Sequence, residues 1–183
     1  MANYKEKTVL MDAATARRAV SRMAYEILER NRGTENLAII GIQTKGVLLA
    51  RLIAEKIAEI EGVCPQMGSL DITFYRDDLT RLSEHPIVAG NDIAFSIEDK
   101  KIILIDDVLY SGRTIRAAME EIFDMGRPER IELAVLIDRG GRELPIRADY
   151  IGRGVPTSRD EYINVAIDDE KIEKVSICGK GEE

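Results

Sequence analysis

The sequence predicts an α/β fold in which helices flank a mainly parallel central sheet. Short aliphatic and β-branched runs alternate with longer segments whose apolar residues recur at helical spacing. Glycines stand where these helical patterns end. In a chain of 183 residues that is 45% hydrophobic, this alternation favours a single domain over residues 1–183.

The first half of the chain contains two helical patterns. Asp12 precedes AATARRAVSRMAYEILERNR, a predicted helix that ends at Gly33. LAIIGI is a predicted buried strand, and GVLLARLIAEKIAEIEG is a helix that ends at Gly62. MGSLDITFYRDD alternates as a strand does, and the polar residues after it predict a long mobile loop within about residues 71–91.

The second half repeats this alternation. KIILID and IELAVLID are predicted buried strands, and TIRAAMEEIFDMG between them is a helix that ends at Gly126. A stretch rich in glycine and proline follows as far as Thr157, and short strands are predicted in YINVAI and KVSI. Because strands alternate with helices, the sheet is expected to be parallel.

Composition excludes several kinds of protein. The first residues, MANYKEKTVL, are charged, and no apolar run approaches the roughly 20 residues of a membrane span. Cys64 and Cys178 stand far apart without metal-site spacing, which predicts a cytoplasmic protein. The single histidine, His85, has no evident nucleophile partner. A net charge of −7 argues against general nucleic-acid binding but allows a local basic face.

Two loops are expected at the carboxyl ends of neighbouring strands, where open α/β sheets bind ligands. In IILIDDVLYSGRT, the residues from Ser111 to Thr114 offer backbone N–H groups, hydroxyls and a helix start to a phosphate. Asp106 and Asp107 offer acceptors to sugar hydroxyls, or to Mg²⁺ through water. This combination suits a ribose 5-phosphate.

Each half of this motif has a simpler interpretation. Acidic pairs at strand ends occur in receiver domains and in many Mg²⁺ sites, and Ser-Gly-x-Thr alone is compatible with a tight turn. Other nucleotide motifs do not fit, since no Gly-x-x-x-x-Gly-Lys precedes the threonine and no Gly-x-Gly-x-x-Gly follows a strand. The second loop, GIQTKG, is equally compatible with an ordinary turn between strand and helix.

The whole stretch resembles the phosphoribosyl-pyrophosphate (PRPP) signature of type I phosphoribosyltransferases. With DITFYRDDL and LIDRGGRELPIRADYIG, it is similar to the family of bifunctional pyrimidine operon regulatory proteins and uracil phosphoribosyltransferases, over nearly all the chain. The resemblance implies a type I phosphoribosyltransferase fold with a small hood. It also implies transfer of phosphoribose from PRPP to uracil, which gives UMP and pyrophosphate. Further implications are binding of a pyrimidine-operon leader mRNA stem-loop under UMP or UTP control, and a homodimer or higher homo-oligomer.

The resemblance assigns the residues of the reaction. DITFYRDD and the polar loop after it resemble the hood that closes over PRPP and Mg²⁺, although a solvated hairpin fits the same residues. Tyr110 stands where purine salvage enzymes have an aspartate, which argues against a purine substrate. The catalytic candidates are Asp106, Asp107 and Arg76. The candidates for binding PRPP or nucleotide are Thr44, Lys45, Gly46, Asp106, Asp107, Val108, Leu109, Tyr110, Ser111, Gly112, Arg113 and Thr114.

Base contacts are expected in the region of Asp138 to Arg142 and Ile151. The spacing of the residues does not choose among them.

The regulatory role depends on other residues. By themselves they fit an ordinary solvated helix face, but the resemblance favours a basic RNA-binding surface. Tyr25 and Gly141 stand where relatives have histidines near this surface. A uracil phosphoribosyltransferase without RNA regulation stays open, as does, less favoured, a purine phosphoribosyltransferase. The candidates for RNA binding are Arg18, Ser21, Arg22, Arg30, Arg147 and Arg153.

Overall fold

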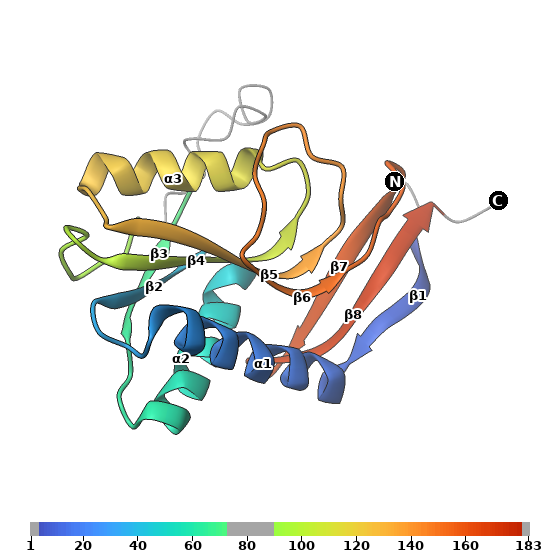
Figure 1. Ribbon diagram of the computed structural model, residues 1–183. Coiled ribbons are helices and arrows are strands. Elements are labelled where there is room, and N and C mark those ends of the chain that lie inside the picture. Colours follow the sequence, from blue (N-terminus) through green and yellow to red (C-terminus); the bar gives the residue numbers. More distant parts are fainter. Residues whose placement is uncertain (1–3, 73–89, 181–183) are drawn as a thin grey trace.

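The computed structural model describes residues 4–72 and 90–180, and its main body has three layers (Figure 1). Helices α1 (Ala13–Asn31) and α2 (Lys45–Glu61) cover one face of a five-stranded sheet, and α3 (Arg113–Met125) covers the other. Every pairing in this sheet is parallel, in the order β3-β2-β4-β5-β6. The strands are β2 (Leu37–Ile42), β3 (Gln66–Leu70), β4 (Lys101–Leu109), β5 (Arg130–Asp138) and β6 (Tyr150–Gly154).

The core lies on both faces of this sheet, which is why its central strands are apolar throughout. Along β4, Ile103 and Ile105 pack with α1 and α2, whereas Ile102 and Leu104 pack with α3, and all four are fully buried. None of the described helices is long and apolar enough to cross a membrane.

The three predicted helices form close to their expected bounds. Asp12 caps α1 as predicted, because its carboxylate accepts the backbone N–H of Thr15 at 2.7 Å. Arg32, with φ +57°, takes the left-handed position one residue before the predicted Gly33. Gly62 ends α2, and Gly126 follows α3 directly.

A second, smaller sheet is antiparallel and joins the two ends of the chain (Figure 1). It has the order β1-β8-β7, with β1 (Tyr4–Asp12), β7 (Glu161–Asp168) and β8 (Lys171–Lys180). This sheet is the small hood of the predicted fold, but its position corrects the prediction, which put the hood near residues 71–91. Most of that segment, 73–89, lies outside the described residues.

The predicted strand bounds also differ from those in the structure. Of MGSLDITFYRDD, the residues from Met67 to Leu70 belong to β3, Asp71 and Ile72 lie outside a strand, and residues 73–78 lie outside the described residues. Ser69 also forms an antiparallel bridge with Asp92. The side chain of Asn91 accepts the N–H of Asp71 at 2.9 Å, so the two described flanks of the expected loop lie together. The predicted short strands in YINVAI and KVSI are parts of the longer β7 and β8.

Candidate functional site

Two loops meet at the carboxyl ends of β2 and β4. The first loop (residues 43–46) follows β2, the second loop (residues 107–114) includes the end of β4, and the two strands are direct parallel neighbours. A Cβ atom added to Gly46 would lie 2.6 Å from the carbonyl oxygen of Ile105 and 3.4 Å from Oδ1 of Asp106. Only glycine fits at this crossing, which brings the first loop against the acidic pair.

The first loop offers one hydroxyl and one cation. Thr44 is exposed and Lys45 is half-buried at the start of α2, and neither side chain forms an ion pair or hydrogen bond with another residue of 4–72 or 90–180. The peptide bond between Gln43 and Thr44 is cis. The Lys45 amine, the Thr44 hydroxyl and the N-terminus of α2 favour an anionic ligand here.

The adjacent aspartates occupy different environments. Asp106 is only 8% exposed, and its carboxylate accepts the backbone N–H of Asp107 at 2.9 Å. Asp107 is half-buried, so its carboxylate is the more accessible of the two. Asp106 therefore helps to shape the turn, and Asp107 is the better placed to accept hydrogen bonds from a ligand.

The second loop ends in an uncapped helix start. Gly112 has φ +92°, a conformation that other residues rarely adopt, and the side chains of Ile146 and Leu144 pack on its far side. The N–H of Arg113 donates to Oγ of Ser111 at 3.3 Å, and no side chain caps α3. The remaining N–H groups of the first turn of α3 are thus directed into the loop, as a phosphate site requires.

A third loop (residues 138–147) holds the second loop in place. The N–H groups of Arg139 and Glu143 donate to the carbonyls of Leu109 and Ser111, at 3.1 and 2.9 Å. Glu143 also forms an ion pair with Arg113 at 2.6 Å. These contacts place the segment from Asp138 to Arg142, predicted to lie near the base, directly beside the nucleotide motif.

Tyr110 links the second and third loops through its ring. The guanidinium of Arg139 stacks on this ring at 4.0 Å from its centroid, and Arg142 donates to the Tyr110 carbonyl at 2.8 Å. A side chain at position 141 would collide with the ring, so Gly141 lies directly against the second loop. A cavity of about 350 Å³ opens here, lined by Tyr110, Gly141, Arg142, Glu143, Thr157 and Arg159.

Several arginines predicted to bind RNA gather where α1 lies against β6. Arg22 donates to the carbonyls of Ile151 and Gly152, the latter at 2.7 Å, and pairs with Glu26 at 3.1 Å. Arg153 follows Gly152 directly and donates to the carbonyl of Leu10. Arg18, one turn before Arg22, is exposed and bonds the Thr15 hydroxyl at 3.0 Å.

The other three predicted RNA-binding residues are placed differently. Arg30 pairs with Glu132 at 3.3 Å and with Asp149 at 2.9 Å, so its charge is compensated. Arg147 is exposed at the end of the third loop, and Ser21 lines a groove toward α2. The arginine surface is therefore defined as Arg18, Arg22 and Arg153.

Sequence comparison identifies close relatives. Residues 10–165 match the family model of the phosphoribosyl transferase domain. The chain is 59% identical to the bifunctional protein PyrR of Acetivibrio thermocellus over 162 residues, and this aligned region covers 88% of each protein. It is 52% identical to the bifunctional protein PyrR of Bacillus mycoides over 179 residues, and this aligned region covers 96% of this chain and 99% of the relative.

Solved structures share the fold at low sequence identity. A hypoxanthine phosphoribosyltransferase of Trypanosoma cruzi superposes with a TM-score of 0.71 at 16% identity, over 96% of this chain and 98% of the other. One from Staphylococcus aureus gives 0.69 at 18% identity, over 93% of this chain and 92% of the other. These likenesses confirm the predicted fold class.

Proposed function

This chain belongs to the phosphoribosyltransferase family and, within it, to the bifunctional PyrR proteins, and from that premise we propose how its residues perform uracil phosphoribosyl transfer and pyrimidine-operon regulation. The single observation that supports the transferase assignment most is the contact of Gly46 with Ile105 and Asp106. It brings the first loop, which carries Lys45, against the acidic pair at the start of the second loop, as binding of one ligand across both loops would require.

PRPP spans these loops in the proposed complex. Its 5-phosphate lies at the start of α3, where Ser111 and Thr114 supply hydroxyls and the backbone supplies N–H groups. Its ribose hydroxyls donate to Asp107, with Asp106 supporting the turn. Its pyrophosphate lies against the first loop, where Lys45 neutralises part of its charge. The backbone can approach the pyrophosphate closely at Gly46.

Transfer then needs positioning and charge stabilisation more than a protein nucleophile. The bond from uracil N1 to the anomeric carbon forms as the bond from that carbon to pyrophosphate oxygen breaks, and the ribose becomes oxocarbenium-like in between. Uracil N1 loses its proton in the same reaction, to the departing pyrophosphate or to water. Lys45 and the N-terminus of α2 stabilise the departing charge. Arg76, predicted to contact the same pyrophosphate, lies outside the described residues.

Phosphoribosyltransferases generally use Mg²⁺ together with PRPP. The carboxylates of Asp106 and Asp107 suit the water shell of this hard cation, which would enter chiefly on the oxygens of PRPP and neutralise charge on the leaving group. Asp107 would hold such a water on its half-buried carboxylate while Asp106 keeps the turn in shape.

The base is proposed to lie beside the third loop. The cavity next to Tyr110 and Gly141 adjoins the second loop, and backbone groups between Asp138 and Arg142 are close enough to the nucleotide motif to reach a base edge. Ile151 is less suitable, because its carbonyl accepts Arg22 on the α1 side and its side chain packs in the core.

The regulatory half is proposed to use the arginine surface. Arg18, Arg22 and Arg153 form a local basic area on a chain of net charge −7, which suits a specific RNA site with little nonspecific attraction. Tyr25, 56% exposed on the same helix, offers a ring for stacking. We propose a pyrimidine-operon leader stem-loop as the target, a homo-oligomer as the active form and the cytoplasm as its location.

The first experiment measures binding of this stem-loop at fixed salt and Mg²⁺, with and without UMP. UMP should tighten RNA binding, and RNA should tighten UMP binding by the same factor, because coupling between two sites is reciprocal. Arg22→Ala should weaken RNA binding about tenfold, as removal of a charged hydrogen-bond donor does. Arg127→Ala, which removes an exposed cation at the end of α3, is the matched control. Absence of RNA binding in the unmodified protein would contradict the regulatory role, and phosphoribosyl transfer would then be the only proposed function that stands.

The proposed phosphate contact of the second loop is tested with Thr114→Val. Loss of one hydroxyl donor to the 5-phosphate should weaken UMP binding about tenfold in calorimetry, with little change in thermal stability because Thr114 is only half-buried, in the first turn of α3. Thr8→Val, on the exposed edge of the small sheet, is the control for the same change of side chain. Unchanged UMP affinity would make Thr114 a purely structural residue.

A further inference from the structure

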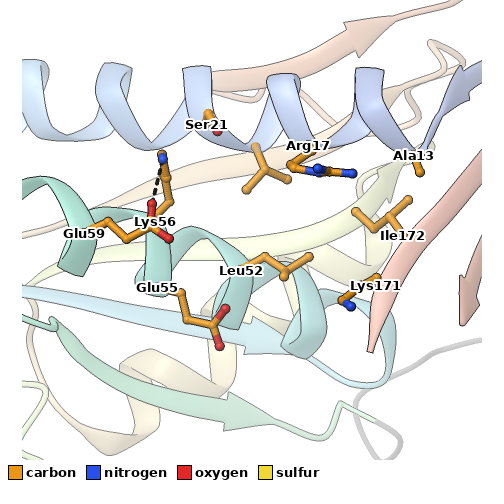
Figure 2. A pocket seen from close by; sticks show the side chains of 10 residues that line it. Ala13, Arg17, Ser21, Leu52, Glu55, Lys56, Glu59, Lys171 and Ile172 are labelled. Atoms are coloured by element: carbon orange, nitrogen blue, oxygen red, sulfur yellow. Dashed lines mark hydrogen bonds and ion pairs between the residues drawn. The ribbon is translucent and has the colours of Figure 1, made fainter. Parts of the chain in front are cut away.

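A groove separates α1 from α2 beside the start of β8 (Figure 2). It lies on the opposite face of the central sheet from α3. Its volume of about 450 Å³ is that of a small-ligand site. No role in phosphoribosyl transfer falls to it, since the nucleotide loops lie at the strand ends. The lining residues are Ala13, Arg17, Val20, Ser21, Leu52, Glu55, Lys56, Glu59, Lys171 and Ile172.

The groove combines an apolar floor with charged ends. Val20, Leu52 and Ile172 give the floor, and they belong to or pack against the core. Figure 2 shows Arg17 and Lys171 at one end, and Lys56 paired with Glu59 at 2.7 Å toward the other. Burial of an apolar or aromatic body on such a floor is favourable.

The two cations at one end are available to a ligand. Arg17 and Lys171 are both exposed, and neither side chain forms an ion pair or hydrogen bond with another residue of the described chain. They belong to α1 and β8, so they converge from different elements on one end of the groove. Glu55, also exposed, lies farther along the groove as an acceptor for amino groups.

The groove continues the arginine surface. Arg17 and Ser21 lie one helical turn apart on the side of α1 toward α2, and they directly precede Arg18 and Arg22 in the chain. A strand of RNA whose backbone contacts Arg18 and Arg22 therefore runs beside the groove that Arg17 and Ser21 line. Ser21, predicted as an RNA contact but displaced from the arginine surface, is one of these lining residues.

We infer that the groove receives one unpaired nucleotide of the RNA. Its phosphate contacts Arg17 and Lys171, its base covers Leu52 and neighbouring apolar side chains, and an amino group of the base donates to Glu55. An unpaired nucleotide fits this chemistry because bases inside a duplex are stacked and their faces are covered, whereas loop bases are free to turn outward. This inference rests on the proposed RNA function and adds a base-reading site to it.

The test uses the pyrimidine-operon stem-loop and removes two charges at a time. Arg17→Ala with Lys171→Ala changes exposed side chains only, so the fold should persist. Binding should weaken about tenfold or more at low salt, and the slope of log K against log salt should fall by about 0.7, the contribution of the one phosphate that Arg17 and Lys171 no longer neutralise. Arg127→Ala with Lys180→Ala removes two exposed cations elsewhere and should leave the slope unchanged.

A second measurement locates the base. Each unpaired nucleotide of the stem-loop is replaced in turn by an abasic one, and one position should weaken binding to the unmodified protein about tenfold. That same position should make little difference to Leu52→Asp protein, because its apolar floor is already disrupted. If the unmodified protein binds RNA but the double variant keeps its affinity and slope, the groove proposal is overturned alone. If the unmodified protein does not bind, the RNA function fails first.

Discussion

Asp107→Asn should lower kcat/KM for PRPP about a hundredfold without changing the thermal stability of the protein. The substitution keeps the shape of the side chain but replaces a charged acceptor by a neutral one, and hydrogen bonds to charged groups contribute about 1.5–3 kcal/mol each. Two ribose hydroxyls donating to this carboxylate give the expected loss. Asp107 is half-buried at a strand end, so the fold does not depend on it.

Steady-state rates with varied PRPP and a fixed, saturating concentration of uracil measure this effect. Asp124→Asn, an exposed aspartate near the end of α3, is the matched control and should keep full activity. Asp106→Asn gives a contrast, because the buried Asp106 carboxylate accepts a backbone N–H and its change should lower stability as well as rate. Normal PRPP kinetics in Asp107→Asn would remove that residue from the site.

Glu132→Ala should lower the free energy of unfolding by about 3 kcal/mol, as removal of one partner from a buried charged network does. Glu132 is 4% exposed and lies on β5 below α1. Its carboxylate accepts hydrogen bonds from Tyr150 at 2.6 Å and from Asn31 at 2.9 Å, and it pairs with Arg130 at 3.0 Å and Arg30 at 3.3 Å. Removal takes away the acceptor of the buried Tyr150 hydroxyl and the carboxylate that pairs with the two arginines.

The loss of unfolding free energy in Glu132→Ala should depend on pH, with the largest loss near neutral pH. Burial by itself would raise the pKa of Glu132, but hydrogen bonds from Tyr150 and Asn31 and the nearby arginines outweigh burial and hold this pKa below its usual value. The stabilisation is therefore present above about pH 4.3 and is lost as the pH falls through the lower, folded-state pKa. Burial and the Glu132 carboxylate raise the pKa of Tyr150, so the network also weakens above about pH 10.

Urea unfolding across this pH range measures the loss of stabilisation both at acidic pH and above about pH 10. The difference between the unmodified protein and Glu132→Ala should be greatest near neutral pH and should narrow toward either extreme. Glu129→Ala, which removes an exposed neighbouring carboxylate, should differ little from the unmodified protein at any pH. A constant difference from pH 3 to pH 11 would show that the ionisation of Glu132 contributes nothing.

The central sheet was predictable because most of its buried residues form short, continuous apolar runs in the sequence. LAIIGI and KIILID are apolar on both faces, as strands between two helical layers must be, and the helices repeat their apolar residues every turn. β1 was not predicted, since only Met11 among Val9, Leu10 and Met11 is fully buried and its partner strand lies at the other end of the chain. β6 was not predicted either, because its sequence, YIGRG, contains two glycines, which are uncommon in strands. Gly152 is needed there because a Cβ would collide with the carbonyl of Leu136 on β5.

The acidic pair and the proposed phosphate-binding residues of the candidate site could be picked out from the sequence because each group is contiguous in the chain. The third loop was only partly predictable. The resemblance pointed to the segment from Asp138 to Arg142 as part of the site, but the backbone hydrogen bonds that join this loop to the second loop leave no pattern in residue types. The stacking of Arg139 on Tyr110 depends equally on the fold. The groove that Arg17 shares with Lys171 joins residues from α1 and β8, which no short motif can connect.

The pairing of the chain ends also has a consequence for how the protein is made. Tyr4 pairs with Lys180, so β1 leaves the ribosome long before its partner strand exists. The strands β2 to β6 and their helices are complete earlier, and among the described residues none of these strands pairs with β1, β7 or β8. During synthesis, we expect the central sheet to form first while β1 waits unpaired, and the small sheet to close only when β8 emerges. A ribosome that stalls before β8 would therefore hold a chain with a nearly finished nucleotide site and a free N-terminal strand, open to pairing with another chain.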